Sequence, residues 1–146
     1  MREKNLPGAV LSVMRSFLIR YCFIDADRIQ TPNTTFKPPT SGIWIRESFN
    51  EGSEEPKSNA ATHEFMVVNY EIFGKASRGT AEVDDMVSRI RRVFPVLGKS
   101  SVIFRNCARQ SAYLKSIDKP AGGIDNSDPT WYRRLVAITV ELYDTR

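Results

Sequence analysis

Residues 72–87, IFGKASRGTAEVDDMV, contain the residue types of a phosphate-binding loop: a strand pattern, a turn with Gly, Lys and Ser, and a helix pattern. Backbone N–H groups and the helix dipole converge on an anion where a strand leads into a helix. A P-loop reads G-x-x-x-x-G-K-S/T, which would require a glycine at Asn69 and a hydroxyl residue after Gly74-Lys75. Neither is present. The segment is therefore predicted to be a strand-to-helix connection in which Gly74 and Gly79 relieve backbone strain.

The other ionisable candidates for chemistry are one histidine and four aspartates. His63, the single histidine, stands where a loop pattern meets a strand pattern, and it is predicted to be a surface or strand-edge residue. Asp25, Asp27, Asp125 and Asp128 fall in segments where aspartate normally stabilises turns through its own backbone. The calcium-loop pattern, with a glycine at its sixth position and a terminal glutamate, is absent there. We therefore expect no metal, no cofactor and no enzymatic activity.

The cysteines and tryptophans also favour a structural interpretation. Cys22 and Cys107 have neither a C-x-x-C partner nor neighbouring histidines, so they form no zinc or redox motif. We expect them to be small apolar residues in a reducing compartment. Trp44 and Trp131 have the ring size to stack on nucleic-acid bases. Single aromatic residues at strand starts more often pack at the edge of a core, and we predict that role here.

The composition indicates one ordered domain over residues 1–146. Hydrophobic residues make up 41% of the chain and charged residues 26%, which excludes wholesale disorder. No apolar run approaches the ~20 residues that a membrane span needs. Arg15 and Arg20 interrupt the apolar N-terminal stretch and no cleavage site follows, so neither a signal peptide nor a membrane partner is expected. The net charge of +4 is compatible with nucleic acid nearby.

Two amphipathic helices are predicted to position these residues. In residues 7–22, apolar side chains recur at steps of three and four and form one stripe. These are Val10, Met14, Phe17, Leu18 and Tyr21. The second helix starts after Thr80, a predicted N-cap, and ends before Pro95. Its apolar face consists of Val83, Met86, Val87, Ile90, Val93 and Phe94.

The second helix carries acidic residues near its start and Arg89, Arg91 and Arg92 near its end. This order complements the helix dipole on a solvated face. The functional alternative is that the three arginines face a polyanion or a neighbouring subunit.

Strand patterns occupy residues 42–49, 63–73 and 131–146, and residues 101–117 form two short strands or one bent strand. The last strand is apolar enough to be central or nearly so. We predict that the inward-facing residues of the two earlier strand regions are Met66, Val68, Tyr70, Ile72, Val102, Phe104, Ala112 and Leu114. In the last strand, one alternating set is Val136, Ile138, Val140 and Leu142, and the other is Ala137, Thr139, Glu141 and Tyr143.

Loop composition completes the expected fold. Residues 24–42 contain three prolines and should be an ordered surface connection. The polar stretch 50–62 is expected to be a long exposed hairpin loop, and residues 118–130 a second loop. The expected fold class is α+β: a mainly antiparallel or mixed β-sheet with two amphipathic helices packed on one face and a long hairpin loop.

Taken together, the chain resembles the tail terminator (tail completion) family of long-tailed bacteriophages. The resemblance covers most of the chain: an amphipathic first helix, then TPNTTFKPPTSGIWIRESF, the segment HEFMVVNYEIFGKASRGTAEVDDMVSRIRRVF, and the closing WYRRLVAITVELYDTR. It implies a structural virion protein that forms a ring, expected to be a hexamer, on the tail tube. The ring would end tube polymerisation and join the tail to the head-completion or connector proteins.

The resemblance also implies partners, a location and contact residues. DNA would pass through the lumen of the ring without sequence-specific binding. The protein would lie at the head-proximal end of the virion tail after assembly in the host cytoplasm. Residues 50–62 would contact a neighbouring subunit or the tube, and residues 118–130 would form a second contact loop. The candidate interface residues are Glu51, Glu54, Glu55, Lys57, Arg89, Arg91, Arg92, Asp125 and Asp128. The acidic stretch NEGSEE and the basic RIRR are candidates for a pair of complementary surfaces.

Two alternatives remain open. A tail tube or head–tail connector subunit would share the structural class, but a tube protein would polymerise by itself into long filaments. A nucleic-acid-binding module would belong to a different class. It would use Arg89, Arg91, Arg92, Arg133 and Arg134, and its affinity for DNA would depend steeply on salt.

Overall fold

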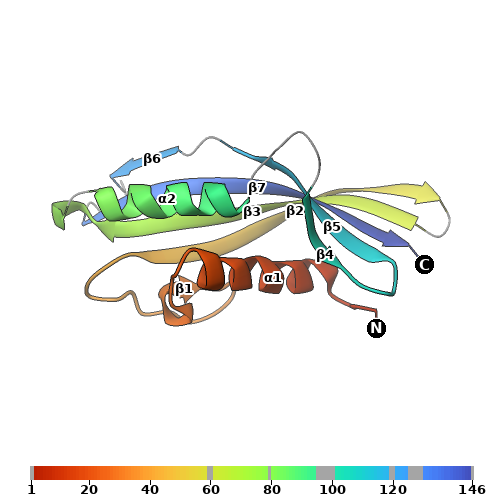
Figure 1. Cartoon of the computed structure of the whole chain (residues 1–146), viewed down its shortest axis with the longest axis horizontal. Coiled ribbons are helices and arrows are strands. Elements are labelled where there is room, and N and C mark those ends of the chain that lie inside the picture. The colour runs from red at the N-terminus through yellow and green to blue at the C-terminus, as the bar shows by residue number, and fades with distance from the viewer. Residues whose placement is uncertain are drawn as a thin grey trace.

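The computed structural model describes residues 2–58, 61–78, 80–94, 101–118, 121–124 and 130–145. Its helices are α1 (Leu6–Tyr21) and α2 (Ala81–Val93), with short 3-10 turns at Ala26–Arg28 and Ala76–Arg78. The strands are β1 (Ile29–Gln30), β2 (Trp44–Ser58), β3 (Ala61–Lys75), β4 (Ser101–Arg105), β5 (Gln110–Ile117), β6 (Ala121–Ile124) and β7 (Trp131–Thr145) (Figure 1).

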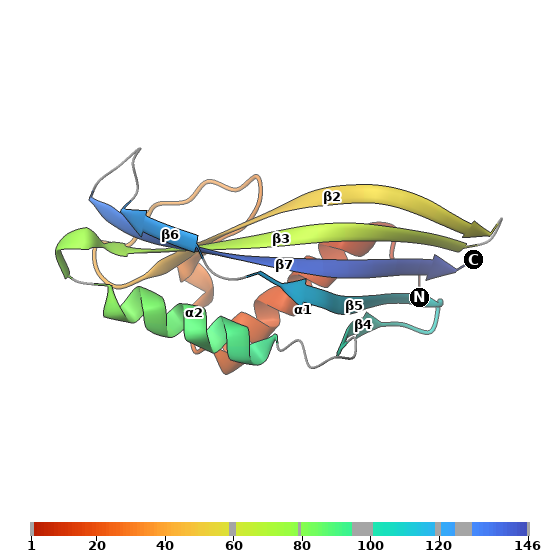
Figure 2. The same ribbon diagram turned by 90° about the horizontal axis from the view of Figure 1, so that it is seen from above.

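The strands form one sheet in the order β1-β2-β3-β7-β5-β4, and β6 also pairs with β7. All pairs are antiparallel except the short β1–β2 pair. Figure 2 shows β7 lying between β3 and β5, which confirms the central position predicted for the last strand. Residues 101–117, for which two short strands or one bent strand were expected, form two strands, β4 and β5.

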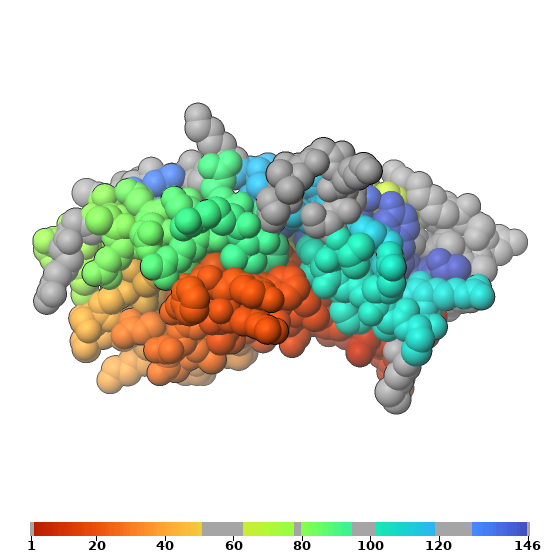
Figure 3. Space-filling model, viewed as in Figure 1, coloured from red at the N-terminus to blue at the C-terminus, as the bar shows by residue number. Residues whose placement is uncertain are grey.

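Both helices contribute to the same hydrophobic core with one face of the sheet, which confirms the α+β fold class. Alternate residues of β3 and β7 lie in this core, as their period of two predicts. The sheet contributes Met66, Val68, Tyr70, Ile72, Val136, Ile138, Val140 and Leu142. Figure 3 shows α1 packed alongside α2. Neither helix is long and apolar enough to cross a membrane, and this finding covers the described residues only.

The two helices start differently. The side chain of Asn5 caps α1 by accepting a hydrogen bond of 3.1 Å from the Gly8 N–H. Thr80 occupies the N-cap position of α2 as predicted, but its hydroxyl makes no capping bond to the backbone. It lies 3.3 Å from Asp84, whose carboxylate also accepts a hydrogen bond of 2.7 Å from Arg134. The start of α2 is therefore fixed to β7 through a side chain.

The expectation of a long exposed loop at residues 50–62 is wrong, because β2 and β3 continue through most of it. The pairing runs to Ser58 opposite Ala61, with irregularities between Glu51 and Glu54 and after Pro56. β7 stays paired with β3 to the same end of the sheet, so a backbone partner is present throughout. Beyond Arg46, β2 has no other strand partner in the described topology, and an edge strand tolerates proline. Low apolar content in a segment therefore does not mean that its backbone is unpaired.

Two smaller expectations are corrected. Residues 121–124 form β6 within the predicted loop 118–130 and pair with residues of β7. Val102, predicted to face inward, is 50% exposed, whereas Ile103 is buried. Between Val102 and Phe104 the register advances two residues on β4 for one on β5, and such a bulge reverses the alternation of faces.

Candidate interaction surface

Exposed apolar side chains gather at the C-terminal end of α1. Ile19 is 39% exposed, Tyr21 51% and Phe23 80%. Among the described residues only one other large hydrophobic, on β4, is exposed. Tyr21 was predicted to belong to the core-facing stripe of the first helix, and that prediction is wrong. Its position in the last helical turn is where an exposed apolar group could have been suspected.

Phe23 has an unusual backbone conformation. Its φ is +58°, in the left-handed region that a bulky residue rarely adopts. α1 has ended one residue earlier, at the C-cap Cys22. Strained backbone of this kind persists only where the surrounding structure enforces it, and it concentrates at functional sites. The conformation places a large aromatic ring in solvent beside the helix end.

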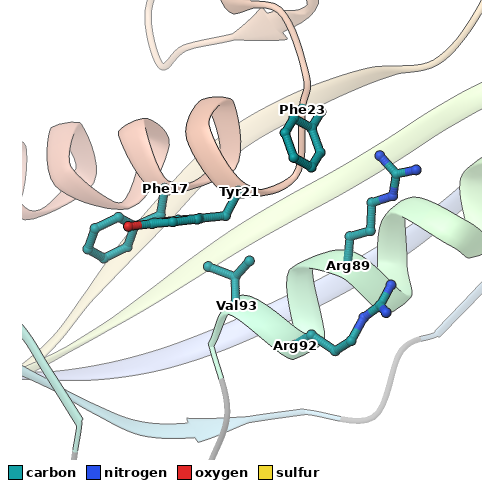
Figure 4. A pocket seen from close by; sticks show the side chains of 6 residues that line it. All are labelled: Phe17, Tyr21, Phe23, Arg89, Arg92 and Val93. Atoms are coloured by element: carbon teal, nitrogen blue, oxygen red, sulfur yellow. The ribbon is translucent and has the colours of Figure 1, made fainter.

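Phe23 lines a groove of about 670 Å³ between the ends of α1 and α2. Figure 4 shows Phe17 and Tyr21 projecting from α1 toward Val93 of α2, while Arg89 extends from α2 toward Phe23. Arg92 lies one turn further along α2 and also lines the groove. Phe17 forms the apolar wall, because its ring lies 6.0 Å from those of both Tyr21 and Phe94. The groove therefore combines an aromatic wall with guanidinium groups. Protein–protein interfaces are enriched in these residue types.

Arg89 of α2 contacts the end of α1 beside the groove. Its Nη1 donates a hydrogen bond of 3.1 Å to the carbonyl oxygen of Cys22, and its Nε lies 2.9 Å from the Asp85 carboxylate. The bond to Cys22 satisfies a carbonyl at the end of α1, where the helix itself provides no donor. Arg89 therefore has a structural role, and its charge is partly neutralised.

The positive charge of Arg92 is not neutralised by any described residue. Arg92 donates a hydrogen bond of 3.4 Å to the Ser88 carbonyl, and it forms no ion pair with any described residue. Arg20 stands beside the groove with its guanidinium 5.4 Å from the centre of the Tyr21 ring. The rim of the groove is therefore positively charged.

The predicted interface residues have different outcomes. Arg89 and Arg92 line the groove, whereas Arg91 is exposed on α2 and is not among the lining residues. Four of the predicted interface residues lie along β2, and their side chains are outside the described part of the structure: Glu51, Glu54, Glu55 and Lys57. Asp125 and Asp128 lie outside the described residues altogether.

The arginines proposed for nucleic-acid binding do not form one surface. Arg133 pairs with Glu71 at 2.6 Å on one side of the sheet. Arg134 pairs with Asp84 of α2, on the side that carries the helices. Successive residues of a strand point to opposite faces, so these two side chains cannot bind the same strand of nucleic acid.

The phosphate-loop interpretation finds no support around Gly74. The space there is about 50 Å³, and the Glu82 side chain lines it together with Lys75. Gly74 does not adopt a positive φ, so the expectation that it relieves backbone strain is wrong. A Cβ at this position would lie 2.7 Å from Cγ2 of Val83, so the glycine permits close packing of β3 against α2. Gly79 lies outside the described residues.

The tryptophans pack together as predicted. Trp44 is buried, and its ring is stacked on that of Phe73 with centroids 4.2 Å apart. Trp131 meets Trp44 edge-on at 5.9 Å, and the Lys75 ammonium lies 4.2 Å from the centre of the Trp131 ring. These contacts describe a cross-strand aromatic cluster rather than free stacking platforms.

His63 is not the surface residue that was predicted. It is buried, and its ring stacks on Tyr143 at 4.5 Å with an interplanar angle of 4°. Its Nε2 lies 3.8 Å from the Glu141 carboxylate, and neither ring nitrogen has a hydrogen-bond partner among the described residues. The β3–β7 register, which sets His63 opposite Tyr143, explains this packing and could not be read from the sequence.

The two cysteines differ. Cys22 is buried, as expected for a small apolar residue, and burial raises the pKa of its thiol to about 11 against the opposing effect of Arg89 and Arg92. Cys107 is exposed, so the same expectation is wrong for it. Within the described residues, no group of three His, Cys, Asp or Glu side chains is arranged to hold a metal ion.

A buried ion pair lies beneath α1, and no pattern in the sequence indicated it. Arg15 contacts the Glu47 carboxylate at 2.6 Å, and the Glu47 side chain is completely buried. Tyr70 lies opposite Glu47 on β3, and burial together with that carboxylate raises the pKa of Tyr70 well above its usual value. The strand pattern had marked Tyr70 as core, but not its charged neighbours.

Comparison with known proteins identifies a shared fold, but no family and no function. No protein-family model matches the chain, and no curated protein does. Ten chains of solved structures match. One of them, which carries only a sequence identifier as its name, superposes over 100% of this chain and 97% of its own length, with a TM-score of 0.56 and 15% sequence identity. At that identity the match shows a shared fold alone.

Proposed function

We propose that this protein is a structural subunit of a bacteriophage tail: a tail terminator that forms a ring at the end of the tail tube and connects it to the head-completion proteins. The proposal rests on the sequence resemblance described above. It requires a protein that acts through its surfaces, with contacts that repeat from one subunit to the next.

The observation that best supports an assembly role is the groove between α1 and α2. Two exposed aromatic side chains, Tyr21 and Phe23, line it together with Arg89 and Arg92. A monomeric protein rarely exposes such a patch, and aromatic residues with arginine are the usual anchors of protein interfaces. An α+β subunit with this patch is suited to head-to-tail contact, which generates a closed ring when the rotation between subunits closes.

Immunogold electron microscopy of assembled phage particles tests the proposal. Antibody against this chain should label the junction between capsid and tail. Label distributed along the whole tail would instead identify a tube subunit, and label absent from particles would contradict a virion role. A fluorescence assay with duplex DNA tests the nucleic-acid alternative, which predicts tight binding that weakens steeply with salt.

A further inference from the structure

The outer edge of β2 is open beyond its short pairing with β1. β1 pairs with β2 only at Ile45 and Arg46, and no other described strand lies on that side of β2 (Figure 2). In an antiparallel strand, successive residues direct their backbone N–H and C=O groups to opposite sides. Between Glu47 and Asn50, alternate residues therefore have backbone groups that β3 does not bind. An open edge of this kind is a template for pairing with another chain.

The sequence explains why β1 stops so early. Pro32 has no N–H with which to continue the pairing, and Asn33 turns the chain away with a φ of +59°. The hydroxyl of Thr34 donates a hydrogen bond of 2.7 Å to the carbonyl oxygen of Thr31, which stabilises that turn. Local turn chemistry thus leaves the edge of β2 open.

A groove follows this open edge. Its volume is about 460 Å³, and it is lined by residues 30–33 and by residues 46–49. Because β1 pairs with residues 45 and 46, the groove begins where that pairing ends. An extended segment lying in the groove would pair with β2 directly after β1.

The face of the sheet that carries Arg46 has a surplus of positive charge beside this groove. Arg46 and Arg133 share the carboxylate of Glu71, at 3.9 Å and 2.6 Å, and both arginine side chains are partly exposed. Nε of Arg46 has no hydrogen-bond partner among the described residues. Since Arg46 lines the groove, a carboxylate in the groove would meet a cation that is only partly neutralised.

The opposite face of β2 favours an apolar neighbour. Phe49 is partly buried and packs against the hydrophobic core. Glu47, on the same face, is already neutralised by Arg15 at 2.6 Å. An apolar side chain placed beside Phe49 would extend the core by one residue. The two faces of the edge therefore favour different side chains, as successive residues of one extended segment would provide.

We propose that this edge binds an extended segment of a protein other than this chain, which pairs with β2 and alternates acidic with apolar side chains. The acidic residue lies opposite Ser48, diagonally next to Arg46, and the apolar residue lies opposite Phe49. Main-chain hydrogen bonds supply affinity in such strand addition, and alternate side chains supply specificity. A second copy of β2 fits less well, because Arg46, Ser48 and Asn50 offer no carboxylate on the corresponding face.

The inference goes beyond the proposed ring and does not depend on it. The groove beside β2 shares no lining residue with the groove between α1 and α2.

Amide hydrogen exchange of the isolated protein tests whether the edge is open. Among residues 47–50, alternate amides should exchange rapidly, while the others, bonded to β3, should be protected. Protection of all four amides would show that the edge is already covered and would overturn the proposal.

A synthetic peptide tests the chemistry of the partner. The probe is an acetylated and amidated heptapeptide that alternates glutamate with valine, titrated into isotope-labelled protein and followed by nuclear magnetic resonance. The backbone signals of residues 46–50 should shift, and their rapid amides should exchange at least about threefold more slowly at saturation. The control peptide, with lysine in place of glutamate, should bind about tenfold more weakly because it meets Arg46 with a like charge.

A charge variant identifies the residue that selects the acidic peptide. In Arg46→Gln, the preference for the glutamate peptide should fall from about tenfold to about threefold or less. Arg91→Gln is the matched control, because Arg91 is exposed on α2 and lines neither groove, and it should keep the preference. Circular dichroism shows whether each variant is folded.

Each other outcome contradicts the proposal. Absence of shifts at residues 46–50, or equal binding of the two peptides by the native chain, would show that this edge does not select an acidic strand. Equal shifts at β4, the opposite edge of the described sheet, would indicate unspecific strand addition. If the glutamate peptide disperses oligomers of the chain in sedimentation velocity, the edge is occupied by a second copy and not by another protein.

Discussion

The guanidinium of Arg89 on α2 donates a hydrogen bond of 3.1 Å to the backbone carbonyl of Cys22, the residue that ends α1. The bond joins the two helices at the base of the groove. Phe23, the next residue, has the left-handed conformation that often follows a helix C-cap. The shape of the proposed binding surface therefore depends on a residue that the sequence marked only as part of a basic cluster.

Arg89→Met should lower the free energy of unfolding by about 1 kcal/mol, because the Cys22 carbonyl loses its donor and the arginine is partly solvated. Urea unfolding followed by circular dichroism measures the effect. Arg91→Met is the matched control: Arg91 is exposed and forms no ion pair with a described residue, so its loss should stay within about 0.5 kcal/mol. Equal losses for the two variants would show that the bond to Cys22 is unimportant.

Arg15→Met should destabilise the protein by about 3 kcal/mol, because it leaves the buried Glu47 carboxylate without its cation. The double variant Arg15→Met with Glu47→Leu should recover most of that loss, since no charge then remains buried. Urea unfolding of the wild type, both single variants and the double variant completes the cycle. Additive losses would mean that the two side chains do not interact.

Gly74→Ala should cost about 1–3 kcal/mol, because the new methyl group would lie 2.7 Å from Val83 Cγ2, and valine in a helix cannot easily change rotamer. In a Val83→Ala background, Gly74→Ala should be less costly than it is in the wild type. Thermal unfolding of the four proteins measures the coupling. If Gly74→Ala is equally costly with and without Val83→Ala, the close approach is not the cause.

Stability should fall as the pH rises above about 9. Burial raises the pKa of Cys22 from 9.0 to about 11, so between these values the native thiol keeps a proton that the unfolded thiol has lost. The native state then binds more protons, and the free energy of unfolding decreases with pH. Urea unfolding at about pH 8 and about pH 10.5 measures the decline. Cys22→Ala should show a shallower decline, with a residual part from Tyr70; an identical decline would contradict the assignment.

Local patterns in the sequence predicted the elements well where burial and periodicity agree. The spacing of Val83, Val87 and Ile90 located α2, and the alternation from Val136 to Leu142 located the central strand. The failures arose where pairing or register decides the structure. The polar β2–β3 hairpin, the bulge that buries Ile103 and the stacking of His63 on Tyr143 all depend on strand partners that one segment cannot reveal.

The candidate surface was predicted only in part, for a similar reason. Charge clustering singled out Arg89 and Arg92, but a helical stripe assigned Phe17 and Tyr21 to the core. Where α1 ends relative to the sheet determines which of these rings becomes exposed. That depends on the packing of two helices and on a backbone turn at Phe23, neither of which follows from helical spacing.

Mass photometry and electron microscopy of the purified protein over a range of concentrations test the central claim most directly. We predict that the chain assembles, as its concentration rises, into closed rings of about six subunits and goes no further. A protein that stays monomeric at every concentration, or that grows into filaments of unlimited length, would contradict the account.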